Sequence, residues 1–222
     1  MTEPSGASSD KPSRPVVVPA VALVALTAIG ITALLGGLSE APEEPQTLGP
    51  GAVLDQGLYS TKFVESRVTV DKAESQWDED KRFVELVFEV TNKGDKTYQV
   101  GVPPVKLEQA FTSDSFAGSL VKITPAFPKD SGPFTFAQAK GGETRQLHPG
   151  LTSQVILRYQ LKDNEQPPEK ITMDVASFEY EPEWNTNVPR WQMIANENLD
   201  TMKFYPEIKA RVTLAVKKGD AT

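Results

Sequence analysis

An apolar run from Val16 to Leu38 constrains this chain more than any other feature of its sequence. No charged residue lies between Arg14 and Glu40. As a helix the run would extend roughly 35 Å, whereas the hydrocarbon core of a bilayer is roughly 30 Å thick. The sequence therefore predicts a transmembrane helix over residues 15–38, which holds the rest of the chain at a membrane surface.

The charges on either side of this span predict its orientation. Lys11 and Arg14 precede the span, whereas acidic residues follow it and the next cation is Lys62. Because cations beside a span favour the cytoplasmic side, we expect residues 1–14 to form a cytoplasmic tail. The body of the chain is then extracytoplasmic, on a single-pass protein of the plasma membrane.

A cleaved secretory signal is the alternative to an anchor, and the sequence argues against it. The apolar run is longer than the roughly 7 to 15 residues of a signal peptide. The one small-x-small cleavage pattern is Ser39-Glu40-Ala41, and Pro42 after it is a poor start for a mature chain. The chain has no cysteine to accept a lipid. We therefore favour an uncleaved anchor.

Composition limits the classes of partner and of chemistry. The net charge is −7 and the pI is about 4.9, which argues against nucleic acid and against charge-driven binding to anionic lipid. Without cysteine there is no thiolate catalysis and no thiolate metal site. We expect a Pro- and Glu-rich linker over residues 39–57, one domain over 58–218 and a short tail over 219–222.

After Leu58 the hydrophobic period changes to alternation, which is typical of half-buried strands. In the clearest strand, 82–91, one face is entirely apolar: Val84, Leu86, Phe88 and Val90. Glu85 and Glu89 occupy its other face, and an earlier strand has an irregularity near Glu65. Further strands are expected over residues 97–102, 120–124, 153–161, 170–177 and 208–216.

About seven or eight short strands without a long amphipathic helix predict an all-β fold, an antiparallel sandwich. The spacing of Leu199 and Met202 suggests one brief helix near residues 196–203. Two segments, 103–142 and 179–207, are longer than ordinary hairpin loops and rich in aromatic residues.

Two stretches carry a resemblance to a known group of proteins. Residues 83–94 read FVELVFEVTNKG, and residues 148–161 read HPGLTSQVILRYQL. With the short tail, the single span and the acidic linker, they resemble the anchored immunoglobulin-like envelope domains of Gram-positive bacteria, above all actinobacteria. The resemblance implies an immunoglobulin-like β-sandwich outside the cell, and its motifs are signals of fold rather than of chemistry. The long aromatic segments exceed a minimal domain of this kind, which argues against a plain spacer.

No set of residues forms a recognisable catalytic or metal site. His148 is the only histidine, and its Pro-Gly turn favours an ordinary turn residue over a general base or metal ligand. The acidic clusters at residues 78–80 and 179–183 match no calcium loop, which favours solvated surface over a weak calcium site. Because no nucleophile, base and orienting group can be named together, we expect no enzyme, no cofactor and no small-molecule substrate.

What remains is contact surface. Small residues spaced three and four apart share one face of the span, where a partner helix could approach closely: Ala25, Ala28, Thr32 and Gly36. The plainer interpretation is that such residues are frequent in spans. In the ectodomain, large aromatic side chains either cap the ends of the core or dock a partner: Phe111, Phe116, Phe127, Phe134, Phe136, Trp184 and Trp191.

These observations favour a non-catalytic accessory subunit of a larger integral-membrane complex, with the β-domain on the outer face. Size, topology and the lack of catalytic residues resemble the small accessory subunits of the actinobacterial cytochrome bc–aa3 respiratory supercomplex. The alternative is a free-standing envelope module that binds or senses a ligand, a peptide or a cell-wall polymer. An open cleft lined by the large aromatics would favour the binding module, and a flat patch near the bilayer would favour the subunit.

Overall fold

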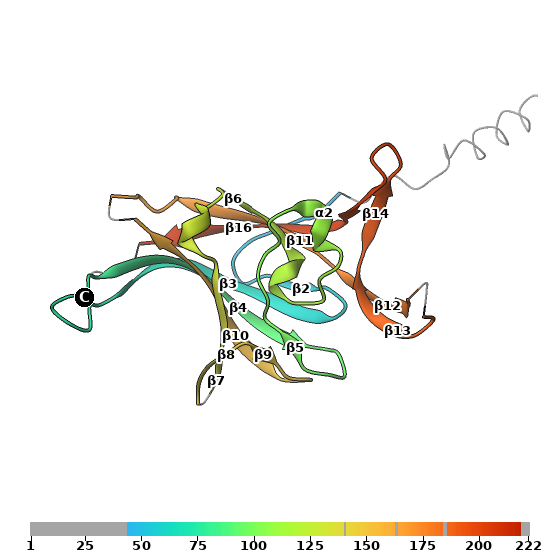
Figure 1. Ribbon diagram of the computed structural model, residues 1–222, viewed down its shortest axis with the longest axis horizontal. Helices are drawn as coiled ribbons and strands as arrows, with labels where there is room; N and C mark the ends of the chain where they lie inside the picture. The colour runs from blue at the N-terminus through green and yellow to red at the C-terminus, as the bar shows by residue number, and fades with distance from the viewer. Residues whose placement is uncertain (1–43, 140, 163, 184–185, 219–222) are drawn as a thin grey trace, which may run out of the picture. The chain divides into compact units, whose positions relative to one another are not determined.

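The computed structural model describes residues 44–139, 141–162, 164–183 and 186–218, and these residues form an all-β fold. Ten strands make one continuous sheet in the order β6–β11–β16–β3–β4–β10–β7–β8, with β1 added to β16 and β2 added to β3 (Figure 1). Their bounds are β1 Gln46–Leu48, β2 Val53–Asp55, β3 Tyr59–Asp71, β4 Lys81–Asn92, β6 Leu120–Thr124, β7 Phe134–Ala139, β8 Gly142–Thr144, β10 Thr152–Leu161, β11 Lys170–Ala176 and β16 Ile208–Lys217. The all-β part of the prediction is confirmed.

The other described elements are short. Three strand pairs lie outside the main sheet: β5 Tyr98–Gln99 with β9 Gln146–Leu147, β12 Phe178–Pro182 with β13 Pro189–Met193, and β14 Ala195–Asn198 with β15 Lys203–Pro206. The helical turns are α2 Leu107–Ala110, η1 Ala117–Ser119 and η2 Lys129–Ser131. In Figure 1 the β12–β13 hairpin and β14 project at the opposite end of the domain from the turn between β3 and β4.

One hydrophobic core serves both halves of the main sheet. The half containing β3, β4 and β10 joins the half containing β6, β11 and β16 where Val216 pairs in parallel with Ser66. Buried side chains from both halves belong to a single cluster, which includes the whole apolar face expected for residues 82–91. The alternating face of β11 lies in the same cluster, so the period-two pattern identified the inward side chains correctly.

Most of the expected strands are present in the expected places. β4, β6, β10, β11 and β16 match their predicted ranges within one or two residues. The irregularity near Glu65 is a β-bulge after Phe63. The strand expected over 97–102 shrinks to β5, because Gly101 has a φ of 70° and Pro103 follows shortly after.

The brief helix predicted near residues 196–203 is wrong, because this segment forms the β14–β15 hairpin. The Asn198 side chain accepts hydrogen bonds from the amides of Asp200 and Thr201, at 3.1 and 3.0 Å. Met202 follows in the left-handed region with a φ of 53°. A side-chain turn of this type competes directly with helix formation.

The segment expected to be a linker, residues 39–57, enters the sheet in the part that the structure describes. β1 pairs in parallel with β16, and β2 pairs antiparallel with β3. Leu54 is 3% exposed and belongs to the core. Strands of three residues are too short for alternation to reveal them, so composition alone suggested a linker.

The two stretches that carry the resemblance are neighbours in space. β4 and β10 pair antiparallel along their length. Beyond this ladder, Asn92 forms a bridge with Pro149, and its carbonyl accepts the amide of Gly150 at 2.8 Å. The buried Asn92 side chain also satisfies three backbone groups, namely the carbonyls of Lys96 and Leu147 and the amide of Gly94.

Candidate binding groove

A groove of about 730 Å³ lies between the β12–β13 hairpin, β14–β15 and residues 111–114. We call it the hairpin groove. Its volume falls within the range of roughly 300 to 1,000 Å³ that is typical of ligand sites. Both hairpins belong to the segment that the sequence marked as too long for an ordinary loop, so its extra length builds the walls of a cavity.

Aromatic residues are part of the lining of the hairpin groove. The rings of Phe111 and Phe204 lie 5.2 Å apart, and Phe204 is 41% exposed. Trp191 also borders the groove, but it pairs with Tyr180 in the hairpin register, and its ring packs partly against the core, 5.4 Å from that of Tyr180. Large apolar surfaces beside water are the usual contacts of a bound partner.

Carboxylates outnumber cations in the hairpin groove. The antiparallel register places Glu179 opposite Gln192 and Glu181 opposite Arg190, on one face of the hairpin. Four carboxylates and two cations line the groove: Asp114, Glu179, Glu181 and Glu183, with Lys96 and Arg190.

Only part of this charge is neutralised locally. Glu183 pairs with Arg190 at 2.7 Å, and the Lys96 ammonium lies 5.0 Å from the centre of the Tyr98 ring. Within the described residues, Asp114, Glu179 and Glu181 have no ion-pair partner. The groove therefore has an excess of negative charge near the exposed ring of Phe204.

The excess of negative charge in the groove affects the pKa of Glu179. Burial raises the pKa of its carboxyl, and the nearby charges of Glu181 and Glu207 raise it further. The ionised form is therefore less favourable in the folded protein than in the unfolded chain.

Glu179→Gln is accordingly expected to stabilise the domain at neutral pH, by at most about 0.5 kcal/mol because the site is partly open to screening solvent. The gain should shrink as pH falls through the raised pKa, since the wild-type carboxyl then becomes neutral as well. Urea unfolding of both proteins at pH 7.5 and at pH 4 measures this. A loss of stability at pH 7.5 would contradict the prediction.

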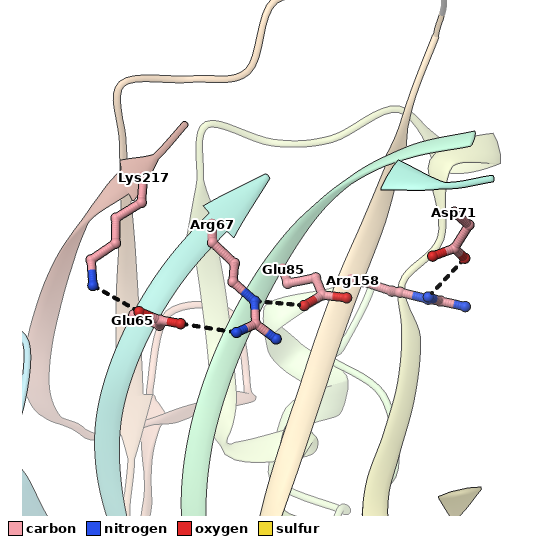
Figure 2. Close-up of polar contacts among 6 residues, drawn as sticks. All are labelled: Glu65, Arg67, Asp71, Glu85, Arg158 and Lys217. Atoms are coloured by element: carbon pink, nitrogen blue, oxygen red, sulfur yellow. Dashed lines mark hydrogen bonds and ion pairs between the residues drawn. The ribbon is translucent and has the colours of Figure 1, made fainter. Parts of the chain in front are cut away.

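A second polar cluster crosses the outer face of the sheet (Figure 2). Lys217 and Arg67 both bind Glu65, at 2.7 and 3.1 Å, and the Nε of Arg67 donates to Glu85 at 3.0 Å. These contacts join β16, β3 and β4, and Lys217, followed by Arg67, lowers the pKa of Glu65. Glu85 is only 5% exposed, so the outer face of β4 is buried at Phe83, Glu85 and Val87.

The same face continues onto β10 through Arg158. Its guanidinium donates to Asp71 at 3.1 Å and lies 4.4 Å from the centre of the Phe83 ring. The charged side chains drawn in Figure 2 are paired with one another, and we call them the ion-pair ladder. We therefore interpret the ion-pair ladder as a structural feature that stabilises the packing of neighbouring strands.

The structure separates the aromatic residues that the sequence grouped together. Phe111 and Trp191 meet at the hairpin groove, whereas Phe134, at 46% exposure, lies in a different surface depression. Phe116 and Phe136 are buried, at 0% and 8%, and offer no surface to a partner.

Of the other predicted contact residues, one lies at the margin of the core and the rest lie outside the described residues. Phe127 stacks on Tyr159 with ring centres 4.0 Å apart, at the margin of the core. Trp184 lies outside the described residues, and so does the small-residue face of the predicted span: Ala25, Ala28, Thr32 and Gly36.

Sequence reasoning missed Phe204 and the carboxylates as members of one site. The pattern of Glu179, Glu181 and Glu183 favours solvated surface, although a spacing of two also places them on one face of a strand. Asp114 and Phe204 come from distant segments, and only the tertiary structure brings them to the same groove.

The described residues contain neither a metal-ligand cluster nor a membrane-spanning helix. No group of three or more histidine, aspartate or glutamate side chains there could hold a metal ion. His148 lies in its turn, with Nδ1 3.0 Å from the hydroxyl of Thr97. In the described part of the chain no helix has the length and apolarity needed to cross a membrane, and residues 15–38 lie outside it.

No known protein family matches the chain, and neither characterised proteins nor solved structures provide a match.

Proposed function

We propose that this protein is a non-catalytic binding module, anchored at the outer side of the plasma membrane by residues 15–38. The observation that supports this function is the hairpin groove, where carboxylates without ion-pair partners among the described residues lie beside the exposed ring of Phe204. An arrangement that offers contact surface and unpaired charge, without a nucleophile and its base, suits binding better than catalysis.

We further propose that the domain is an immunoglobulin-like antiparallel sandwich. Support comes from the two resembling stretches, which pair as neighbouring strands and are tied together at Asn92. The shared core of the two halves of the sheet is consistent with such packing. In this architecture, recognition belongs to the connections at the ends of the strands.

Site-specific photo-crosslinking in intact cells tests the binding function. A photoreactive phenylalanine analogue at Phe204, in the hairpin groove, is expected to form a discrete adduct after irradiation. The same analogue at Phe134 is the matched control, because this side chain is similarly exposed but lies elsewhere. Equal adducts at both positions, or none at Phe204, would argue against a binding role for the groove.

A second candidate is an accessory subunit of a larger membrane complex, such as a respiratory cytochrome complex. The small-residue face of the predicted span favours it, because such faces let helices pack closely. Purification in mild detergent through a tag on Thr222, followed by mass spectrometry, tests this candidate. Recovery of the protein alone, at its monomer size, would count against it.

Substitutions in the span separate a packing helix from a mere anchor. Leucine at Thr32 or Gly36 should push a partner helix away, and such changes commonly matter by about 1 kcal/mol or more. Leucine at Ala33, which lies beside this face and not on it, should be milder. At equal expression, we expect partners to be lost from the first two variants and retained by the third. Equal retention in all three would mean that the span only anchors the domain.

A further inference from the structure

The hairpin groove combines three properties that together limit the classes of ligand it could bind. Its lining has two more carboxylates than cations. Its wall includes the ring of Phe204, which is 41% exposed and lies beside that of Phe111, where it can contact a long side chain. Within the described residues each hairpin is a two-stranded sheet, so each of its strands has one edge that is not paired with another strand.

We propose that the hairpin groove binds an extended, lysine- or arginine-rich segment of a partner polypeptide. This inference rests on the proposed binding function and names the class of its ligand. The cationic heads would lie against Asp114, Glu179 and Glu181, which lack ion-pair partners within the described residues. Their aliphatic stems would pack on the paired rings of Phe111 and Phe204.

Charge disfavours the other obvious ligand classes. An anionic polymer would meet an uncompensated negative surface and would be repelled. A neutral glycan could stack on the rings, but it would leave the carboxylates without a counter-charge. A polypeptide adds backbone amides and carbonyls, which can pair with an open strand edge when the segment is extended.

The proximity of Glu179 to two further glutamates also favours a cationic ligand. Glu181 and Glu207 add to the effect of burial in raising the pKa of Glu179. A cation bound between these groups would remove part of their repulsion, so binding and protonation should compete. We expect the affinity for a basic peptide to fall as pH is lowered.

The experiment uses the full chain in nanodiscs of neutral phosphatidylcholine, with empty nanodiscs as the blank. The probe is a fluorescent peptide of about ten residues in which lysine and valine alternate, read by anisotropy. A peptide with glutamate in place of lysine, spermine and a soluble cell-wall glycan fragment form the comparison arms. Binding of the lysine peptide should weaken between about 50 and 500 mM NaCl.

Two pairs of variants test whether the peptide binds in the groove, each comparing a groove substitution with a matched one elsewhere. Glu179→Gln combined with Glu181→Gln should weaken the lysine peptide about tenfold. Glu74→Gln combined with Glu79→Gln removes the same charge from the exposed β3–β4 connection and should change binding less than about twofold. Phe204→Ala should weaken binding, whereas Phe134→Ala, at similar exposure, should not.

The outcomes decide between the proposals. Equal weakening by both charge pairs, or equal binding of the glutamate peptide, would overturn the inference. Glycan or spermine binding that exceeds lysine-peptide binding and depends on Phe204 would overturn it too, while leaving the binding function intact. If no probe responds to any groove substitution and Phe204 forms no adduct in cells, both the inference and the binding function fail.

Discussion

Asn92→Ala is expected to lower the free energy of unfolding by about 3 to 5 kcal/mol, among the largest effects of any single substitution in this domain. The side chain is fully buried. Its Nδ2 donates to the carbonyls of Lys96 and Leu147, both at 2.8 Å, and its Oδ1 accepts the amide of Gly94 at 2.9 Å. Alanine would remove the partner of three backbone groups, of which the Leu147 carbonyl is buried and the other two are partly buried.

Urea unfolding of the full chain, followed by circular dichroism, measures this loss. Asn196→Ala is the matched control, because Asn196 is exposed on β14 and should change stability by less than about 0.5 kcal/mol. A loss for Asn92→Ala no larger than that of the control would mean that the turns after β4 and before β10 hold together without this side chain.

Asn92 also marks the limit of what the sequence could predict. Its Asn-Lys-Gly turn and the alternation before it are local signals, so β4 and its inward face were predictable. The contact with Leu147, 55 residues away, is not local, and neither is the bond from the Gln56 side chain to the carbonyl of Ala176. Periodicity indicates which side chains turn inward, but not which ones meet there.

The hairpin groove shows the same division between local and tertiary information. The presence of Phe111 and Trp191 in long segments made them candidates for contact, and both line the groove. Phe116 came from the same kind of segment and lies in the core, because the turn at η1 directs it inward. Composition cannot separate an aromatic residue that caps a core from one that faces a cavity, since both lie among Gly, Ser and Pro.

The groove depends on the main sheet through the turn that follows β2. Gly57 has a φ of 81°, and a Cβ at this position would collide with the carbonyl oxygen of Phe178 and lie 3.2 Å from the Trp191 ring. Next to it, the carbonyl of Gln56 accepts the amide of Phe178 at 2.7 Å. Phe178 begins β12, the strand that carries the groove carboxylates Glu179 and Glu181, so this turn fixes the base of one groove wall.

Gly57→Ala is therefore expected to reduce stability by about 2 to 4 kcal/mol and to displace the β12–β13 hairpin, which weakens binding in the groove at the same time. Gly51→Ala is the matched control, since Gly51 has a similar φ of 78° but nothing within 4 Å of its added methyl group. It should show only the backbone cost of about 1 to 2 kcal/mol.

Unfolding midpoints and the emission of Trp191, with the other two tryptophans replaced by phenylalanine, measure the two effects separately. For Gly57→Ala we expect a lower midpoint and a shifted Trp191 emission, and for Gly51→Ala a smaller loss with unchanged emission. If the two variants behave alike, the cost at Gly57 is purely conformational, and the turn does not hold the hairpin. The groove would then owe its shape to the packing of Met193 and Phe178 on the core, and not to the close approach of two backbones at Gly57.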